Sequence, residues 1–196
     1  MNTRLAWTQG NNIYLTRENI LKMAMTEETP PDFLLWLDSD NPPSIPGFEL
    51  LLGAIDASPE VSVVGGWYRF FNPHTKEVHV AAGYNGRIHS HNLTEEEVLK
   101  ADHLIEVDFI GFGFCLMRRQ VIDDIGLERC FEPLVFPEPN HNGHSWATDD
   151  DGFFHRAKAV GHRVFVHPAV HVPHEKFLNI PGTFEGSQEI PILKEI

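Results

Sequence analysis

Two carboxylates one residue apart directly follow an unbroken apolar run in the stretch FLLWLDSD at 33–40. Asp38 and Asp40 repel each other at this spacing unless a cation or solvent lies between them. A hard divalent ion takes oxygen ligands of this kind and commonly also binds substrate phosphates. A solvated Asx turn ahead of a proline-rich loop would explain the same residues. Open α/β sheets place ligands at the carboxyl ends of their strands, but the pattern is common, and both explanations stay open.

A second acidic cluster opens a predicted helix and comprises Thr148, Asp149, Asp150 and Asp151. Thr148 as the N-terminal cap, with acids stabilised by the helix dipole in the first turn, accounts for much of this pattern. Three consecutive aspartates nevertheless exceed what capping requires. An aspartate at the edge of a pocket can also act as a general base that takes a proton from a hydroxyl.

Histidine is abundant, with 12 copies, and His167, His171 and His174 lie close together near the end of a predicted strand. His167 and His171 share one face of that strand, whereas His174 points the other way if the strand continues. The sequence contains neither an HExxH motif nor the short histidine–carboxylate pairs of facial-triad iron sites. A histidine-rich metallohydrolase is therefore the weakest of the enzyme alternatives.

The helices and strands that position these side chains can be predicted from hydrophobic periodicity. The pattern indicates that helices and strands alternate along the sequence. Helices are predicted at 13–25, 48–57, 95–101, 119–126 and 150–161, and strands at 33–37, 61–70, 105–119 and 163–174. The apolar run at 33–37 predicts a strand buried on both faces, as in a parallel sheet covered by helices. Short alternating runs between 70 and 93 predict a hairpin excursion outside the main sheet.

Composition limits the classes of protein that this chain can belong to. A length of 196 residues with 42% hydrophobic content predicts one domain, here 1–175, followed by a tail or arm at 176–196. A net charge of −13 argues against a nucleic-acid partner. The longest strongly apolar run, 109–117, is too short to span a bilayer, and no signal-peptide pattern is present, so we expect a cytoplasmic protein. Cys115 and Cys130 are expected to be buried thiols.

The order of four segments is more specific than any single motif. LLWLDSD, VVGGWY, VDFIGFGFCLMRRQVIDDIG and DDDGFFHRAKAVGHRVFVHPAVHVPH follow one another. This arrangement resembles the GT-A glycosyltransferases, especially those of the family 2 type, over roughly residues 10–175. The resemblance implies an α/β, Rossmann-like, mostly parallel sheet. It also implies transfer of a sugar, with inversion, from a nucleotide-diphosphate donor such as a UDP- or GDP-sugar to a glycan or other hydroxyl acceptor.

The same resemblance assigns roles to the acidic clusters. Asp40 is implied as a ligand of Mn²⁺ or Mg²⁺, Asp38 as a contact of the nucleotide or sugar that also faces the metal, and His174 as the residue that completes the metal site. The family pattern F-x-x-R-x-x-x-x-G is matched by Phe153, Arg156 and Gly161. That alignment places the acidic pair at Asp149 and Asp150, with Asp150 as the base that deprotonates the acceptor hydroxyl.

Further contacts follow from the resemblance. Gly111 and Gly113 are implied to line the donor and acceptor pocket, where glycine would permit close backbone approach. Arg17 corresponds to a donor contact on the first helix. Trp67, Tyr68 and Trp146 could stack on a sugar or base, with core packing as the equal alternative for each.

Only about thirty residues precede the strand that leads to Asp38 and Asp40, the DxD pair. The unit that binds the nucleotide base in the family is therefore expected to be reduced in this chain. Three explanations are compatible with this: a compact enzyme with a reduced donor site, a truncated chain, or a non-catalytic carbohydrate- and metal-binding module. A strand edge left unpaired by the missing unit would favour a second copy of the chain as a partner.

Overall fold

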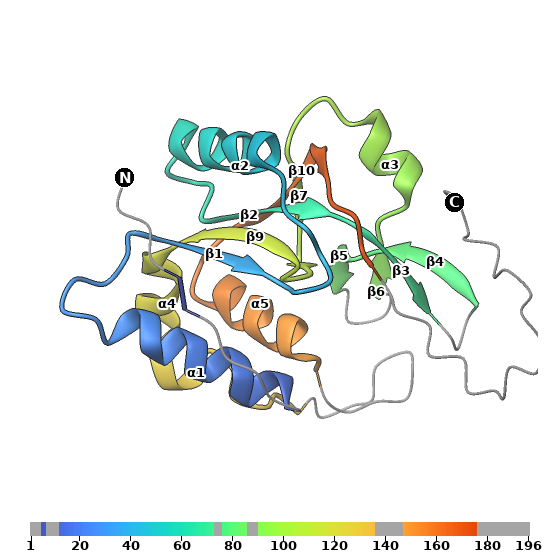
Figure 1. Cartoon of the computed structure of the whole chain (residues 1–196). Coiled ribbons are helices and arrows are strands. Elements are labelled where there is room, and N and C mark those ends of the chain that lie inside the picture. Colours follow the sequence, from blue (N-terminus) through green and yellow to red (C-terminus); the bar gives the residue numbers. More distant parts are fainter. Residues whose placement is uncertain (1–4, 7–11, 73–75, 86–89, 136–146, 176–196) are drawn as a thin grey trace, which may run out of the picture.

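A five-stranded sheet forms the centre of the protein in the computed structural model, which describes residues 5–6, 12–72, 76–85, 90–135 and 147–175. The strands lie in the order β1, β9, β2, β10, β7, with the bounds Phe33–Leu37, Phe114–Arg118, Val63–Trp67, Val164–His171 and Ile105–Val107 (Figure 1). The predicted tail at 176–196 and Trp146 fall outside the described residues.

The sheet is mixed rather than mostly parallel, which corrects the predicted pairing. Only β2 and β10 pair in parallel, and the pairs β1–β9, β9–β2 and β10–β7 are antiparallel. Helix α2, Ile45–Ala57, connects β1 to β2, and these two strands run in the same direction. However, β9 enters between them from the opposite direction. The domain is therefore of mixed α/β type.

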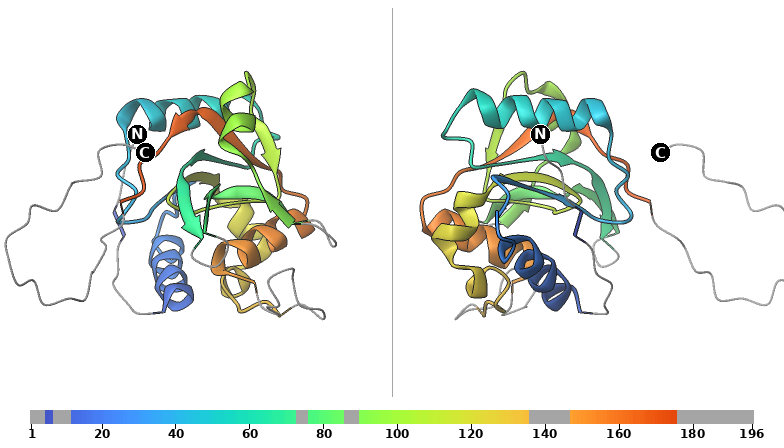
Figure 2. Two further views of the ribbon diagram at one scale, coloured as in Figure 1. Left: turned by 90° about the vertical axis from the view of Figure 1, so that its right-hand side faces the viewer. Right: turned by 60° about the vertical axis from the view of Figure 1, so that its left-hand side comes forward.

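Helices cover both faces of the sheet and create two hydrophobic cores (Figure 2). On one face lies α2, whose Leu51 and Ile55 pack with Phe114 and Leu116 of β9. On the other face lie α1, α4 and α5, with the bounds Ile13–Met25, Arg119–Ile125 and Asp149–Ala159. Alternate residues of β9 enter the two cores, as the two-residue repeat of a strand requires. None of the helices in the described ranges is long and apolar enough to cross a bilayer.

Strand β1 is buried on one face only, so the prediction of burial on both faces is wrong. Leu34 and Trp36 are buried, whereas Leu35 and Leu37 are 37% and 43% exposed. The reason is position: β1 pairs only with β9 among the described residues and lies at the end of the sheet. A helix that covers the middle of a sheet leaves the outer strand partly uncovered.

The segment predicted as one long strand at 105–119 contains three short strands. β7 ends at Val107, β8 spans Phe109–Ile110 in a separate sheet, and β9 begins only at Phe114. The predicted excursion outside the main sheet is confirmed. Its strands form the hairpin β3–β4 and the small sheet β6–β5–β8, with the bounds Arg69–Asn72, Glu77–Val80, Ser90–Asn92 and Ala82–Asn85 for β3, β4, β6 and β5. Helix α3, Glu95–Lys100, begins with a capping box formed by Thr94 and Glu97.

Candidate active site

Three segments that are distant in the sequence meet beyond the carboxyl ends of β1, β2 and β10. The loop after β1 carries Asp38 and Asp40, α5 begins with Asp149 and Asp150, and His174 follows β10. A backbone hydrogen bond joins two of these segments: the amide of Glu175 donates to the carbonyl of Asp40 at 2.8 Å. The fold thus brings both predicted acidic clusters and His174 to one edge of the sheet.

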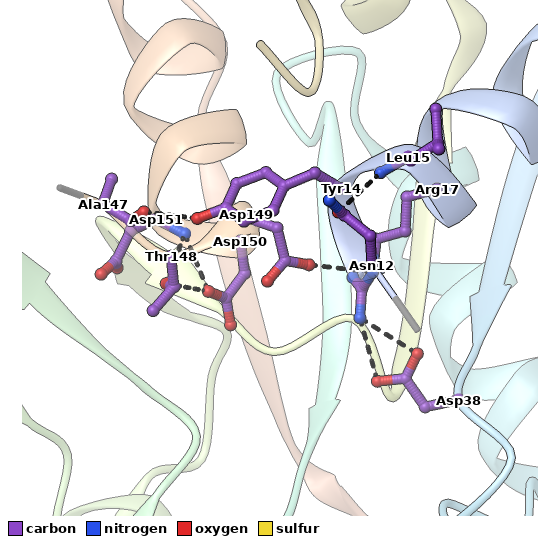
Figure 3. Close-up of polar contacts among 10 residues, drawn as sticks. All are labelled: Asn12, Tyr14, Leu15, Arg17, Asp38, Ala147, Thr148, Asp149, Asp150 and Asp151. Carbon is purple, nitrogen blue, oxygen red and sulfur yellow. Dashed lines mark hydrogen bonds and ion pairs between the residues drawn. The ribbon is translucent and has the colours of Figure 1, made fainter. Parts of the chain in front are cut away.

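Arg17 of α1 links the two acidic clusters (Figure 3). Its Nη2 donates to both carboxylate oxygens of Asp38, at 3.1 and 3.2 Å. Its Nε lies 2.9 Å from Oδ2 of Asp149, an ion pair without the alignment of a hydrogen bond. The residue is only 7% exposed. A single buried guanidinium therefore faces a carboxylate from each cluster.

The surroundings of Arg17 make this cation an unusual one. Its guanidinium carbon lies 4.3 Å from the centre of the Phe112 ring, a cation–π contact. Its Nη1 is buried and has no hydrogen-bond partner in the described structure. Buried donors are normally paired, and an unpaired one at a polar site commonly marks a place for a ligand or water.

Among the described residues, the charge of Arg17 does not balance the acidic side chains around it. Burial raises the pKa of Asp38, and the neighbouring carboxylates of Asp40 and Asp150 raise it further, although Arg17 acts in the opposite direction. The pKa of Asp149 is likewise raised by burial and by Asp150, against the effect of Arg17. Excess negative charge of this kind favours binding of an additional cation.

Asp40 and His174 approach each other as a pair. Nε2 of His174 lies 3.3 Å from Oδ2 of Asp40, and Nδ1 lies 2.9 Å from the carbonyl oxygen of Arg69. A carbonyl can only accept, so Nδ1 carries the proton in that bond. Metal-binding histidines are commonly held in the same way, with one ring nitrogen bonded to a backbone carbonyl and the other directed to the ion.

These residues fit a divalent ion as a small ligand set. Among the described residues, no group of three His, Cys, Asp or Glu side chains is arranged to hold a metal. Asp40 and His174 supply one oxygen and one nitrogen, whereas both oxygens of Asp38 are bonded to Arg17. Mg²⁺ is often held by one or two carboxylates together with substrate phosphates, so a two-residue set is chemically adequate. In the described structure, the carboxylate of Asp38 is engaged by Arg17, and its predicted contact with the metal stays a prediction.

Asp150 belongs to the cap of α5. Its Oδ1 accepts hydrogen bonds from the Thr148 hydroxyl and from the amide of Asp151, the latter at 2.9 Å. The Thr148 hydroxyl oxygen in turn accepts from the amide of Asp151 at 3.3 Å. The capping explanation is thus confirmed for Thr148, but these bonds use only Oδ1, and Oδ2 of Asp150 takes part in neither.

The matched family pattern in α5 has structural roles. Phe153 is fully buried, Arg156 donates to the carbonyls of Gly152 at 3.0 Å and Glu132 at 2.5 Å, and Gly161 follows the helix with a φ of +95°. These residues fix the helix that presents Asp149 and Asp150.

Three residues predicted as ligand contacts lie against protein atoms in the described structure. Trp67 is 2% exposed and donates to the carbonyl of Pro168 at 2.8 Å, so its ring has no face for a sugar. A Cβ atom at Gly111 would lie 1.9 Å from the Tyr68 hydroxyl, and one at Gly113 would lie 2.3 Å from Oδ1 of Asn41. The glycines therefore accommodate protein atoms rather than a donor.

Sequence reasoning missed two residues that build this site. Asn41 is 1% exposed and donates from Nδ2 to the carbonyl of Pro173 at 2.9 Å, which ties the DxD loop to the segment carrying His174. Its place directly after DSD was an available signal. Phe112, which supports Arg17, offered none, because an aromatic residue in an apolar run is ordinarily a core residue.

No protein-family model matches this chain, and a comparison with curated proteins finds no match. Among solved structures, the crystal structure of A197 from STIV is similar over 91% of this chain and 83% of its own, with 17% sequence identity and a TM-score of 0.48. A likeness at that level supports no conclusion about chemistry, so the site is interpreted from its own residues.

Proposed function

We propose that this protein is a metal-dependent glycosyltransferase that moves a sugar from a nucleotide-diphosphate donor to an acceptor hydroxyl with inversion. The observation that carries the proposal is the convergence of the DxD loop, the acidic start of α5 and His174 at one sheet edge, with Arg17 between Asp38 and Asp149. The resemblance of the four sequence segments to GT-A glycosyltransferases of the family 2 type points to the same chemistry.

Each side chain has a role in this proposal. Asp40 and His174 would hold Mn²⁺ or Mg²⁺, which when bound supplies positive charge to the departing diphosphate. Asp150 takes the proton from the acceptor hydroxyl. The acceptor oxygen then bonds to the anomeric carbon while the bond from that carbon to the diphosphate oxygen breaks, and the nucleoside diphosphate leaves with the electron pair.

In the same proposal, Arg17 binds the nucleotide-sugar, and Asp38 holds Arg17 in place. The unpaired Nη1 of Arg17 can donate a hydrogen bond to a phosphate or base oxygen of the nucleotide-sugar. The ion pair with Asp38 holds the guanidinium in place. A guanidinium fixed beforehand loses little freedom on binding, so its contact contributes more to affinity than that of a mobile surface arginine.

Release of nucleoside diphosphate from a panel of UDP- and GDP-sugars tests the proposal. We expect release from one donor in the presence of Mn²⁺, and loss of that release with chelator or with Asp40→Ala. Asp150→Asn is expected to lower turnover by about 100-fold or more, since general bases commonly contribute that much. Full turnover by Asp150→Asn would remove the proposed base. Asp56→Asn, a change of the same type at an exposed position of α2, is the matched control.

A non-catalytic carbohydrate-binding module is the second candidate. It is favoured by the bonding of both Asp38 oxygens to Arg17, which leaves fewer carboxylates to engage a metal diphosphate. Calorimetry combined with the release assay separates the two candidates. A binding module binds the sugar or the nucleotide-sugar without releasing nucleoside diphosphate, whereas an enzyme binds the nucleotide-sugar and releases nucleoside diphosphate.

A further inference from the structure

The phenol of Tyr68 lies buried against the candidate metal ligands. Tyr68 directly follows β2 and is 8% exposed. Its ring packs on the imidazole of His174, with 4.9 Å between ring centroids and 60° between the planes. Burial raises the pKa of its hydroxyl, and the carboxylates of Asp38 and Asp150 raise it further, so the side chain stays neutral.

Gly111 and Gly113 provide the space that this phenol occupies. A Cβ atom at Gly111 would lie 1.9 Å from the hydroxyl oxygen and 2.6 Å from Cζ of Tyr68, and one at Gly113 would lie 2.8 Å from Cε1. Atoms that are not bonded to each other do not approach so closely. Any larger residue at position 111 must therefore displace the ring, because the close-packed interior offers no spare volume.

Consecutive residues hold His174 from two sides. The ring of Tyr68 forms one wall, and the carbonyl oxygen of Arg69 accepts from Nδ1 at 2.9 Å. With its proton on Nδ1, the imidazole presents Nε2 to Asp40, 3.3 Å away. A ring rotated out of this position would lose both the carbonyl bond and the approach to Asp40.

We propose that Tyr68 is a positioning residue for the candidate metal site, which acts through His174 by fixing the orientation of its imidazole toward Asp40. The role belongs to the ring, since the ring makes the contact with His174, and the hydroxyl is not required. The inference rests on the proposed function for the identity of the metal. The packing of Tyr68 on His174 does not depend on it.

Three variants separate the ring from the hydroxyl. Tyr68→Phe keeps the ring, Tyr68→Leu keeps apolar bulk without a flat ring, and Gly111→Ala displaces the ring while every acid and histidine of the site stays in the chain. The first readout is the tautomer of His174, from ¹H–¹⁵N correlations of the imidazole. The second is the affinity for Mn²⁺ by calorimetry with manganese chloride alone, and circular dichroism checks that each variant is folded.

We expect Tyr68→Phe to keep the Nδ1-protonated tautomer and the Mn²⁺ affinity of the wild type. Tyr68→Leu and Gly111→Ala are expected to give mixed tautomers and to weaken Mn²⁺ binding by about 10- to 100-fold, the usual result of losing a group that orients a metal ligand. The proposal is overturned if folded Tyr68→Leu keeps the tautomer of the wild type. If Tyr68→Leu does not fold, the same result in folded Gly111→Ala overturns it.

The two readouts also separate this proposal from the proposed function. If the wild type binds Mn²⁺ neither alone nor together with UDP or GDP, the metal-dependent function fails. The tautomer of His174 still decides the role of Tyr68 in that case, because it is measured without metal. If Mn²⁺ binds equally to all variants while the tautomer changes, His174 is not a ligand and the proposed role of Tyr68 is wrong.

Discussion

Arg17 shows how a single side chain can make an acidic site compatible with a folded protein. It is the cation that faces both Asp38 and Asp149, and its planar guanidinium also lies over the Phe112 ring. Buried carboxylates without such a partner would shift toward the neutral form. Even so, the pKa values of Asp38 and Asp149 stay above their ordinary range, because burial outweighs the effect of Arg17.

At this scale we predict a stability effect of Asp38 that depends on pH. Folding raises the pKa of Asp38 from the ordinary value of 3.8, so the ionised carboxylate destabilises the folded state above the folded pKa. The penalty disappears as the pH falls below 3.8. Asp38→Asn should therefore be more stable than the wild type at pH near 7, and this advantage should shrink as the solution is acidified.

Urea unfolding across a pH series measures this effect, with the exposed change Asp56→Asn as the control that should stay flat. A lower free energy of unfolding for Asp38→Asn at neutral pH would mean that the pair with Arg17 outweighs the cost of burial.

The candidate residues themselves were within reach of sequence reasoning. Short local patterns contain Asp38, Asp40, Asp149 and Asp150. Such patterns can be recognised without knowledge of the fold. The contact of Tyr68 with His174 joins positions separated by more than one hundred residues, and no local pattern announces it. The proximity of Gly111 to Tyr68 was out of reach for the same reason, since Tyr68 is distant in the sequence.

At the scale of elements, Arg118 attaches helix α2 to strand β9. Its Nε donates to the carbonyl of Val61 at 3.2 Å, and its Nη2 donates to the carbonyls of Ser58, at 3.3 Å, and Ile55. Carbonyls at the end of a helix have no partner within the helix. One guanidinium therefore satisfies the end of α2 and fixes the loop that leads into β2.

We predict that Arg118→Lys lowers the free energy of unfolding by about 2 kcal/mol, because a single ammonium cannot span three carbonyls and bonds from charged donors are worth roughly that amount. Arg119→Lys is the matched control at the neighbouring position. Its ion pair with Asp123 has a nitrogen–oxygen distance of 3.6 Å and is exposed, so we expect little change. Equal losses in the two variants, measured by urea unfolding, would contradict a special role for Arg118.

Helices were predicted more accurately than strands, for a physical reason. The bounds of α1 match the expected 13–25, and α4 and α5 end within two residues of the expected 126 and 161, where Gly126 and Gly161 have positive φ. Caps and periodicity are properties of neighbouring residues. The gap between β8 and β9 instead lies where the chain at Gly111 and Gly113 passes close to the Tyr68 ring and the Asn41 side chain.

At the scale of the whole molecule, the order of strands could not be derived from the sequence. The insertion of β9 between β1 and β2 is a long-range pairing, and it converts an expected parallel neighbour into two antiparallel ones. The same arrangement places β1 at the end of the sheet, with Leu35 and Leu37 partly exposed.

We predict that this edge, which pairs with no other strand among the described residues, favours self-association, since strands with unpaired backbone groups invite pairing with another chain. Analytical ultracentrifugation should show reversible dimers at high concentration, and Leu35→Lys should weaken them, because a charge on an edge strand opposes pairing. Leu99→Lys, at an exposed position of α3, serves as the control. A monomer at every concentration would contradict the prediction.

The position of β10 has a consequence for how the protein is made. This strand is the last in the described chain, yet it lies inside the sheet between β2 and β7 and leads directly to His174. A nascent chain on the ribosome acquires all four candidate aspartates before this strand is synthesised. The chain cannot complete the sheet until residues 164–171 have emerged. Until then, the edges of β2 and β7 that pair with β10 remain unpaired. The pair of His174 with Asp40 can therefore form only after β10 has been synthesised.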